Sequence, residues 1–325
     1  MTSSSPTWDA IVIGGGHNGL VAAATLAKSG RKVLLLEAGS DLGGAARTEE
    51  FAPGFRVSVL AHVLNRLHPD VVRTLELERH GLTIERGDFA PSVALSKDGA
   101  LVLHGAYGEV LTGAAPSEQS AWKELRAQLL RYAGILKPFL ARRPPDLSGM
   151  SMTEMAGLGQ TALALKKLGK EDMRDFLRVL LMNVADLLDE QLADDRLKGL
   201  LAFDATIGSH LGPRSPTSLL GLYYRLAGEA GGAAGAQVIP RGGMGAVVAA
   251  IRAAADKAGV SIRPASAVAR IIVEKTRAVG VTLAGGEELR ARASVSAINP
   301  ATTFPDPAGP REVDTGFVRQ VRNIR

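Results

Sequence analysis

Residues 10–27 read AIVIGGGHNGLVAAATLA, in which a short apolar run leads through clustered glycines into an alanine-rich segment. The apolar run is typical of a strand buried on both faces, and the alanine-rich run is typical of a helix packed closely on it. Gly14, Gly16 and Gly19 fit the pattern G-x-G-x-x-G. The first permits the tight turn, the second lets a pyrophosphate approach the backbone, and the third lets helix and strand pack closely. The stretch therefore predicts a dinucleotide site, in which free N–H groups and the helix dipole meet the phosphates.

A second strand and an acidic residue follow at the spacing that such a site requires. Residues 30–37 read GRKVLLLE, so Glu37 closes an apolar run and stands 23 positions after Gly14. About 20 positions are expected before the carboxylate that accepts a hydrogen bond from a ribose hydroxyl. A carboxylate here disfavours a 2′-phosphate, which leaves NAD or FAD. The alternative is that Glu37 is only a solvated residue at the end of a strand.

The next segment favours FAD over NAD. Residues 38–48 read AGSDLGGAART and contain a second glycine pair, Gly43 and Gly44. In a plain NAD-binding domain the second strand normally leads into another helix, whereas a glycine-rich backbone stays open to a further part of an extended cofactor. The alternative is an ordinary loop with a helix cap at Ser40 or Asp41.

Several short motifs make a family resemblance specific. They read HNGLVAA at 17–23, LGGAARTEE at 42–50, PGF at 53–55, LELERHGL at 75–82, GPRSP at 212–216 and GGMG at 242–245. In these motifs the chain resembles the phytoene-desaturase-related FAD-dependent oxidoreductases, and among them the pyridine nucleotide-disulfide oxidoreductase domain-containing branch. The resemblance implies an α/β fold, with an FAD/NAD(P)-binding Rossmann-like domain and an inserted α+β substrate (cap) domain. It also implies FAD as the cofactor, and transfer of a hydride or electrons to the flavin from an apolar small molecule.

The resemblance also assigns residues to the cofactor, although it identifies no catalytic acid or base. The predicted cofactor-binding residues are Gly14, Gly15, Gly16, Asn18, Gly19, Glu37, Ala38, Gly43, Gly44, Ala45, Thr48 and Val268. Val268 stands where related flavoproteins hold adenine through backbone groups. Carotene desaturases usually have Arg after the second glycine pair, but Ala45 stands here, so no guanidinium contact to the cofactor is carried over. His62 is the candidate for a substrate-facing residue.

Composition and charge argue against several other classes of protein. The chain has 325 residues and no Cys, which removes thiol catalysis, disulfide exchange and Cys-ligated zinc. Its net charge of +5 is scattered rather than gathered into a basic stripe, so no nucleic-acid partner is expected. No apolar run is long enough to span a bilayer, and residues 1–6 lack the features of a signal peptide, which favours a cytoplasmic protein. Peripheral membrane contact and oligomer formation stay open.

A metal site is not expected either. His62, Asn65 and His68 are spaced to share one face of a short helix, where they could line a pocket. No carboxylate lies among them at the spacing of a metal ligand. We therefore predict no metal.

Three segments make up the predicted domains. Residues 1–55 are the first segment of the FAD-binding domain, residues 56–235 are the substrate or cap domain, and residues 236–325 are the second FAD-binding segment. Within the cap, residues 208–216 predict a loop dense in turn-forming residues. Its His210 and Arg214 either meet a polar substrate end or only belong to a connection. Residues 231–235, GGAAG, predict a flexible joint or lid hinge.

Members of the resembled family continue well beyond the position of Arg325, so the chain is interpreted as C-terminally truncated. Two rival functions stay open. One is a non-catalytic nucleotide-binding or assembly protein that keeps the fold, and the other is an NAD-dependent oxidoreductase. Amine oxidation is a third, supported by analogy of fold alone.

Overall fold

The structure, a computed structural model, describes residues 8–97, 99–141, 152–304, 309 and 313–324. Its contacts divide the chain into two compact units. Unit 1 comprises Met1–Leu64, Pro69–Thr83 and Ile239–Arg325, and unit 2 comprises Asn65–His68 and Ile84–Val238. The predicted domain boundaries at residues 55 and 235 therefore differ from those of the units. Residues 56–64 and 69–83 belong with unit 1. There the 3-10 turn Leu77–His80 packs on helix α9 (Met244–Lys257), on which the 3-10 turn Gly44–Ala46 of the second glycine pair also packs.

Unit 1 is built on a four-stranded parallel sheet in the order β10-β2-β1-β14. These strands are β1 (Ala10–Ile13), β2 (Val33–Leu36), β10 (Ser261–Arg263) and β14 (Ser294–Ser296). Every residue of β1 and β2 is buried, as their uninterrupted apolar runs predict for central strands. Ile13 pairs with Leu36 on one side and with Ser296 on the other, so the three strands end at the same edge.

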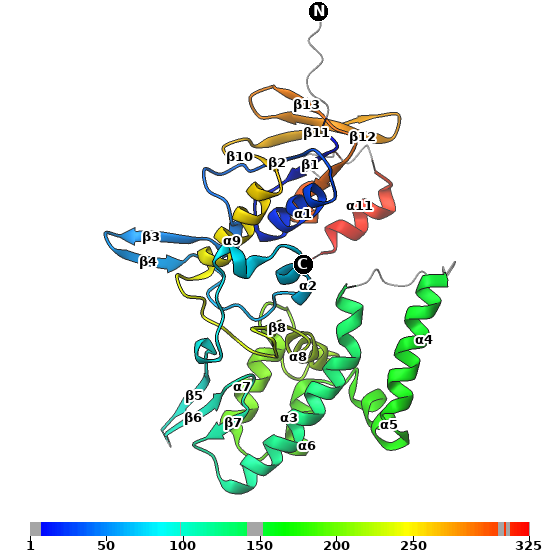
Figure 1. The fold of residues 1–325 in the computed structure, drawn as a ribbon. Coiled ribbons are helices and arrows are strands. Elements are labelled where there is room, and N and C mark those ends of the chain that lie inside the picture. Colours follow the sequence, from blue (N-terminus) through cyan, green and yellow to red (C-terminus); the bar gives the residue numbers. More distant parts are fainter. Residues whose placement is uncertain (1–7, 98, 142–151, 305–308, 310–312, 325) are drawn as a thin grey trace, which may run out of the picture. The chain divides into compact units, whose positions relative to one another are not determined.

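Helices cover one face of this sheet and an antiparallel meander covers the other (Figure 1). The helices are α1 (His17–Lys28) and α9 (Met244–Lys257), which pack against each other. The meander consists of β11 (Val268–Glu274), β12 (Arg277–Leu283) and β13 (Glu288–Arg290). Ile11 and Leu34 of the parallel sheet pack with Val281 and Leu289 of the meander. This layered arrangement is the predicted Rossmann-like α/β fold.

The remaining elements of unit 1 are short. They are the hairpin β3 (Thr48–Ala52) and β4 (Phe55–Ser58), helix α2 (Pro69–Thr74), the 3-10 turns Gly44–Ala46 and Leu77–His80, and helices α10 (Pro300–Thr303) and α11 (Thr315–Arg322).

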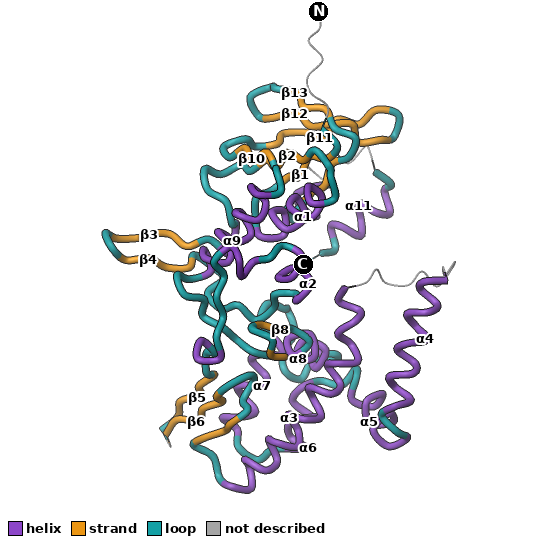
Figure 2. The backbone as a smooth tube through the Cα atoms, in the orientation of Figure 1, coloured by secondary structure: helices purple, strands orange, loops and turns teal. Residues whose placement is uncertain are grey.

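Unit 2 combines small antiparallel sheets with helices, coloured by type in Figure 2. The strands are β5 (Ser92–Ser96), β6 (Gly99–His104), β7 (Val110–Thr112), β8 (Glu229–Ala230) and β9 (Ala233–Ala234). The helices are α3 (Pro116–Leu136), α4 (Met152–Lys167), α5 (Lys170–Val179), α6 (Val184–Gln191), α7 (Asp195–Thr206) and α8 (Ser218–Leu226), with 3-10 turns at Arg86–Asp88 and Lys137–Ala141. Trp122, Tyr132 and Tyr223 are the largest side chains of its core.

Residues 231–235, predicted as a flexible joint or lid hinge, contain the tight turn between β8 and β9, in which Glu229 pairs with Ala234. The prediction of a short helical face around residues 62–68 is wrong. The residues from Ala61 to His68 contain no helix, so His62, Asn65 and His68 do not share a helical face. Within the described part of the chain, no helix combines the length and the apolar character needed to cross a membrane.

Candidate cofactor site

The candidate site lies at the carboxyl edge of the parallel sheet, where a loop leaves each strand. Gly14 follows β1, Glu37 follows β2, Pro264 follows β10 and Ala297 follows β14. Open parallel sheets bind their ligands at this edge, because the loops and helix N-termini converge there. All four loops belong to unit 1.

The first glycine loop is shaped by close backbone contacts. Gly14 has a φ of 101°, a left-handed conformation, and its N–H donates to the carbonyl of Leu36 at 2.8 Å. A Cβ at Gly19 would lie 1.9 Å from the carbonyl oxygen of Gly14. These two glycines are therefore required for the turn itself and for the approach of α1 to β1.

Gly16 differs from them, because a Cβ added there would meet no atom within 4 Å. Gly16 is the N-cap of α1, where no side chain makes a capping hydrogen bond and the first turn has no acidic residue. His17 and Asn18, which open the helix, are not buried. Partial desolvation lowers the pKa of His17, which disfavours a positive charge on the imidazole. The attraction for an anion at this point comes from the backbone N–H groups and the helix dipole.

Glu37 joins the first glycine loop to the loop after β2. Its Oε2 accepts the N–H of Gly15 at 2.6 Å, and its Oε1 accepts the N–H of Gly39 at 2.8 Å. Its backbone N–H donates to the carbonyl of Arg263 at 3.0 Å, and its carbonyl accepts the N–H of Ser266 at 2.7 Å. Each carboxylate oxygen keeps a further lone pair, which a ribose hydroxyl could use.

The second glycine pair lies directly beside the first loop. The N–H of Gly43 donates to the carbonyl of Gly15 at 2.8 Å, and Gly16 and Gly43 form a parallel bridge. Gly43 and Gly44 have φ values of 113° and 54°, and a Cβ at Gly44 would lie 3.4 Å from the Cα of Gly16. Gly43 is also the N-cap of the following 3-10 turn, which has no side-chain cap. The alternative of a helix cap at Ser40 or Asp41 is therefore not what this loop contains.

The Thr48 side chain contacts the start of helix α9. Its Oγ1 accepts the N–H of Gly245 at 2.9 Å, and Ser58 Oγ accepts the N–H of Met244 at 3.1 Å. The hairpin β3-β4 thus supplies two side chains that satisfy the first N–H groups of α9. A Cβ at Gly243 would lie 2.8 Å from Thr48 Oγ1, which explains the glycine. This pairing was not predicted from the sequence, although the GGMG motif before a helix was a signal for close contact.

The other predicted cofactor residues occupy the rim of these loops. Ala38 and Ala45 are exposed, and the carbonyl of Ala45 accepts the N–H of Ala61 at 2.9 Å. Val268 is half-buried at the start of β11, where it pairs with Leu283.

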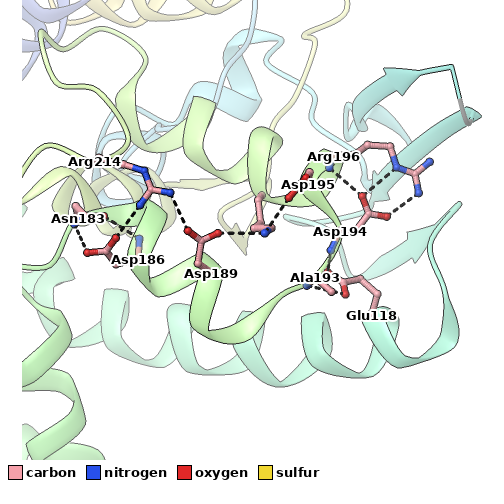
Figure 3. A network of polar contacts seen from close by, with 10 residues as sticks. Glu118, Asn183, Asp186, Asp189, Ala193, Asp194, Asp195, Arg196 and Arg214 are labelled. Atoms are coloured by element: carbon pink, nitrogen blue, oxygen red, sulfur yellow. Dashed lines mark hydrogen bonds and ion pairs between the residues drawn. The ribbon is translucent and has the colours of Figure 1, made fainter.

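The polar candidates outside the loops have a different environment. His62 is exposed, and its Nδ1 lies 3.4 Å from the carbonyl of Leu60. Arg214 makes ion pairs of 3.1 Å with both Asp186 and Asp189 of α6, and Asp189 in turn binds Lys198 (Figure 3). Arg214 therefore belongs to a network of ion pairs on the surface of unit 2.

The described residues contain no candidate metal site. Across residues 8–97, 99–141, 152–304, 309 and 313–324, no three His, Asp or Glu side chains gather into a group that could hold a metal ion.

Similar proteins are found along nearly the whole chain. A profile described as flavin-containing amine oxidoreductase matches residues 19–321. The chain is 32% identical to pyridine nucleotide-disulfide oxidoreductase domain-containing protein 2 of Mus musculus, over 98% of this chain and 58% of that protein. It is 30% identical to a limonene dehydrogenase component of Castellaniella defragrans, over 91% of this chain and 52% of that protein. The chain therefore spans little more than half the length of these relatives.

A solved structure supports the fold. The cyclohexylamine oxidase of Brevibacterium oxydans matches with a TM-score of 0.57 at 21% identity, over 98% of this chain and 63% of that chain. At this level of identity the match concerns the arrangement of helices and strands alone.

Proposed function

Because the chain belongs to the flavin-containing amine oxidoreductases, we propose that it carries the FAD-binding part of an FAD-dependent oxidoreductase of the dehydrogenase or desaturase type. FAD is the cofactor that the family implies. When bound, its isoalloxazine ring supplies the capacity to accept a hydride or electrons from a substrate.

The observation that carries the proposal is the pairing of the two glycine loops through Gly15. Gly15 donates to the Glu37 carboxylate and accepts from Gly43, so three predicted cofactor segments meet at one residue. The open space at Gly16 and the uncapped start of α1 fit a pyrophosphate, and the free lone pairs of Glu37 fit a ribose.

In this assignment the chain's residues bind and orient the cofactor. The backbone of Gly14, Gly15 and Gly16, with Asn18 and Gly19 in the first turn of α1, would hold the pyrophosphate. Glu37 would hold the adenosine ribose, with Ala38 beside it. Gly43, Gly44 and Ala45 would leave the backbone open to the rest of the cofactor, Thr48 would act by holding α9, and Val268 would contact adenine.

We further propose an apolar small molecule as the substrate. The Castellaniella defragrans relative supports this choice, since its name as a limonene dehydrogenase component gives a hydrocarbon substrate for that protein. The family description favours amine oxidation as the second candidate. We assign no catalytic acid or base.

The test is a visible absorption spectrum of the purified chain after it is loaded with FAD and freed of excess cofactor. We expect flavin bands that persist in the wild-type chain and are lost in Gly16→Val and Glu37→Ala. A colourless chain that binds NAD instead would overturn the FAD assignment. Anaerobic addition of hydrocarbons and of amines then separates the two substrate classes by which of them bleaches the flavin. Retained flavin that neither class reduces would support the non-catalytic alternative.

A further inference from the structure

Unit 2 contains buried polar atoms that no described residue satisfies. Arg225 of α8 is 5% exposed, and its Nη1 and Nη2 have no hydrogen-bond partner among the described residues. The hydroxyl of Tyr107, in the loop between β6 and β7, is equally buried and has no partner of good geometry within that part of the chain. Buried polar groups are almost always paired with protein or with ordered water. The unpaired terminal nitrogens of Arg225 therefore indicate a ligand beside Tyr107.

The two side chains lie together with a carboxylate. The guanidinium carbon of Arg225 is 5.5 Å from the centroid of the Tyr107 ring. Burial lowers the pKa of Arg225, and the Asp204 carboxylate of α7 opposes that effect. Burial first, then the charge of Asp204, and also a contact between the Tyr107 hydroxyl and the Asp204 side chain, raise the pKa of Tyr107. The terminal nitrogens of Arg225 nevertheless make no hydrogen bond with Asp204, so the two charges interact without a direct hydrogen bond.

We propose that Tyr107, Asp204 and Arg225 bind ordered water, which links the two charged side chains inside unit 2. Arg225 offers only donors and a carboxylate offers only acceptors, so the two together require a ligand that can both accept and donate. Water accepts from Arg225 and Tyr107 while it donates to Asp204.

An anion fits less well in the same place. Asp204 already faces Arg225, and a multi-atom anion beside it would place a second negative charge against a buried carboxylate, although Arg66 also acts on Arg225 as a cation. A carbonyl oxygen could accept from Arg225 but could not donate to Asp204. The ligand is therefore a small neutral hydroxylic species, and water is the smallest.

The bound water acts as a structural component. It links the β6-β7 loop, α7 and α8, because Tyr107, Asp204 and Arg225 come from these three elements. Buried water of this kind typically makes about three hydrogen bonds and is costly to remove. The inference concerns unit 2 alone and does not depend on whether the chain binds FAD.

The direct test is a crystal structure of the full chain at a resolution that orders internal water. We expect a solvent peak within hydrogen-bond distance of an Arg225 terminal nitrogen, the Asp204 carboxylate and the Tyr107 hydroxyl. A direct ion pair between Arg225 and Asp204 with no solvent peak would overturn the proposal. A bound multi-atom anion between these side chains would overturn it equally.

A second test uses thermal unfolding and needs no crystal. Arg225→Met and Tyr107→Phe each remove a partner of the water while keeping the approximate volume of the side chain. A shared water predicts that the double variant loses less in unfolding temperature than the sum of the single losses. Because Arg225 also lies over the Tyr107 ring, this result supports the water together with the solvent peak in the crystal structure. The control is Tyr223→Phe, which removes from α8 a buried hydroxyl that also has no hydrogen-bond partner among the described residues. It should combine additively with Arg225→Met. Additive behaviour of Tyr107→Phe as well would contradict a shared water.

Discussion

The Glu37 carboxylate accepts the N–H of Gly15 at 2.6 Å, so the acidic residue at the end of β2 fixes the shape of the glycine loop at the end of β1. Glu37, which is expected to contact a ribose, therefore also has a structural role within the protein. Ribose binding and the hydrogen bond to Gly15 can use different lone pairs of the same carboxylate.

Glu37→Ala is expected to weaken FAD binding strongly, because it removes the proposed ribose acceptor and leaves the N–H groups of Gly15 and Gly39 without their partner. Hydrogen bonds to a charged group contribute about 1.5–3 kcal/mol each, so a loss of roughly 10- to 100-fold in affinity is expected. Glu37→Gln keeps one acceptor oxygen and should lose less. Fluorescence titration with FAD measures both, and Glu49→Gln on the exposed strand β3 is the control. Equal affinity in Glu37→Ala and the wild type would contradict the assignment.

Gly16 and Gly19 differ in whether the folded chain has room for a side chain. Gly19→Ala would place its Cβ 1.9 Å from the Gly14 carbonyl, whereas a Cβ at Gly16 meets nothing within 4 Å. We expect Gly19→Ala to lower the unfolding temperature and abolish FAD retention, while Gly16→Val keeps a near wild-type unfolding temperature and loses only FAD. Differential scanning fluorimetry and absorption on the same samples distinguish these outcomes. Undiminished FAD binding by Gly16→Val would show that this space is not used by the cofactor.

Thr48→Val should act mainly on stability. The variant keeps the shape of the side chain but removes the oxygen that accepts the N–H of Gly245 at the start of α9. Loss of such a capping contact costs about 1 kcal/mol in the free energy of unfolding. Thr48→Ser retains the oxygen and is the control. Chemical denaturation measures the difference, and a loss of FAD affinity without any loss of stability would instead favour direct contact of Thr48 with the cofactor.

Arg214→Gln tests whether the loop at 208–216 recognises a substrate or only stabilises unit 2. The Arg214 side chain is 72% exposed in its pairs with Asp186 and Asp189, and exposed pairs contribute at most about 1 kcal/mol. We expect a small fall in unfolding temperature that disappears in high salt, with substrate KM unchanged. A raised KM for a polar substrate would restore the substrate-binding interpretation.

Asp194 should make the stability of unit 2 sensitive to acid. Its side chain caps α7 by accepting the N–H of Arg196, and the hydrogen bond from the Arg196 side chain lowers the pKa of this carboxyl. Because the folded-state pKa lies below the unfolded one, the stabilisation is complete above the unfolded pKa and is lost as pH falls through the folded pKa. Asp194→Asn should therefore show a shallower fall of unfolding temperature on acidification than the wild type. Parallel curves for the two proteins would exclude this contribution.

Local pattern predicted the centre of the fold correctly. The strand, glycine turn, helix and second strand over residues 10–37 are determined by apolar runs and glycine spacing, and all are confirmed. The family resemblance drawn from short motifs is confirmed by the profile match and by the Mus musculus relative. The elements over residues 10–37 can be predicted because each depends on residues that are close in the sequence.

What could not be predicted depends on residues far apart in sequence. Nothing near Thr48 indicates that its hydroxyl caps a helix beginning at Met244, and nothing near Arg214 indicates Asp186 as its partner. Helix α2 ends at Thr74, and Glu76, whose φ is 51°, separates it from the 3-10 turn Leu77–His80.

The order of strands in unit 1 has a consequence for biosynthesis. β1 and β2 leave the ribosome long before their partners, since Ile11 pairs with Ser294 and Leu34 pairs with Ser261, so the edges of their sheet stay unpaired until the whole of unit 2 has been translated. Residues 84–238 form a continuous stretch that can begin to fold in the meantime. During this interval the nascent chain exposes the unpaired edges of two apolar strands, a condition that favours aggregation.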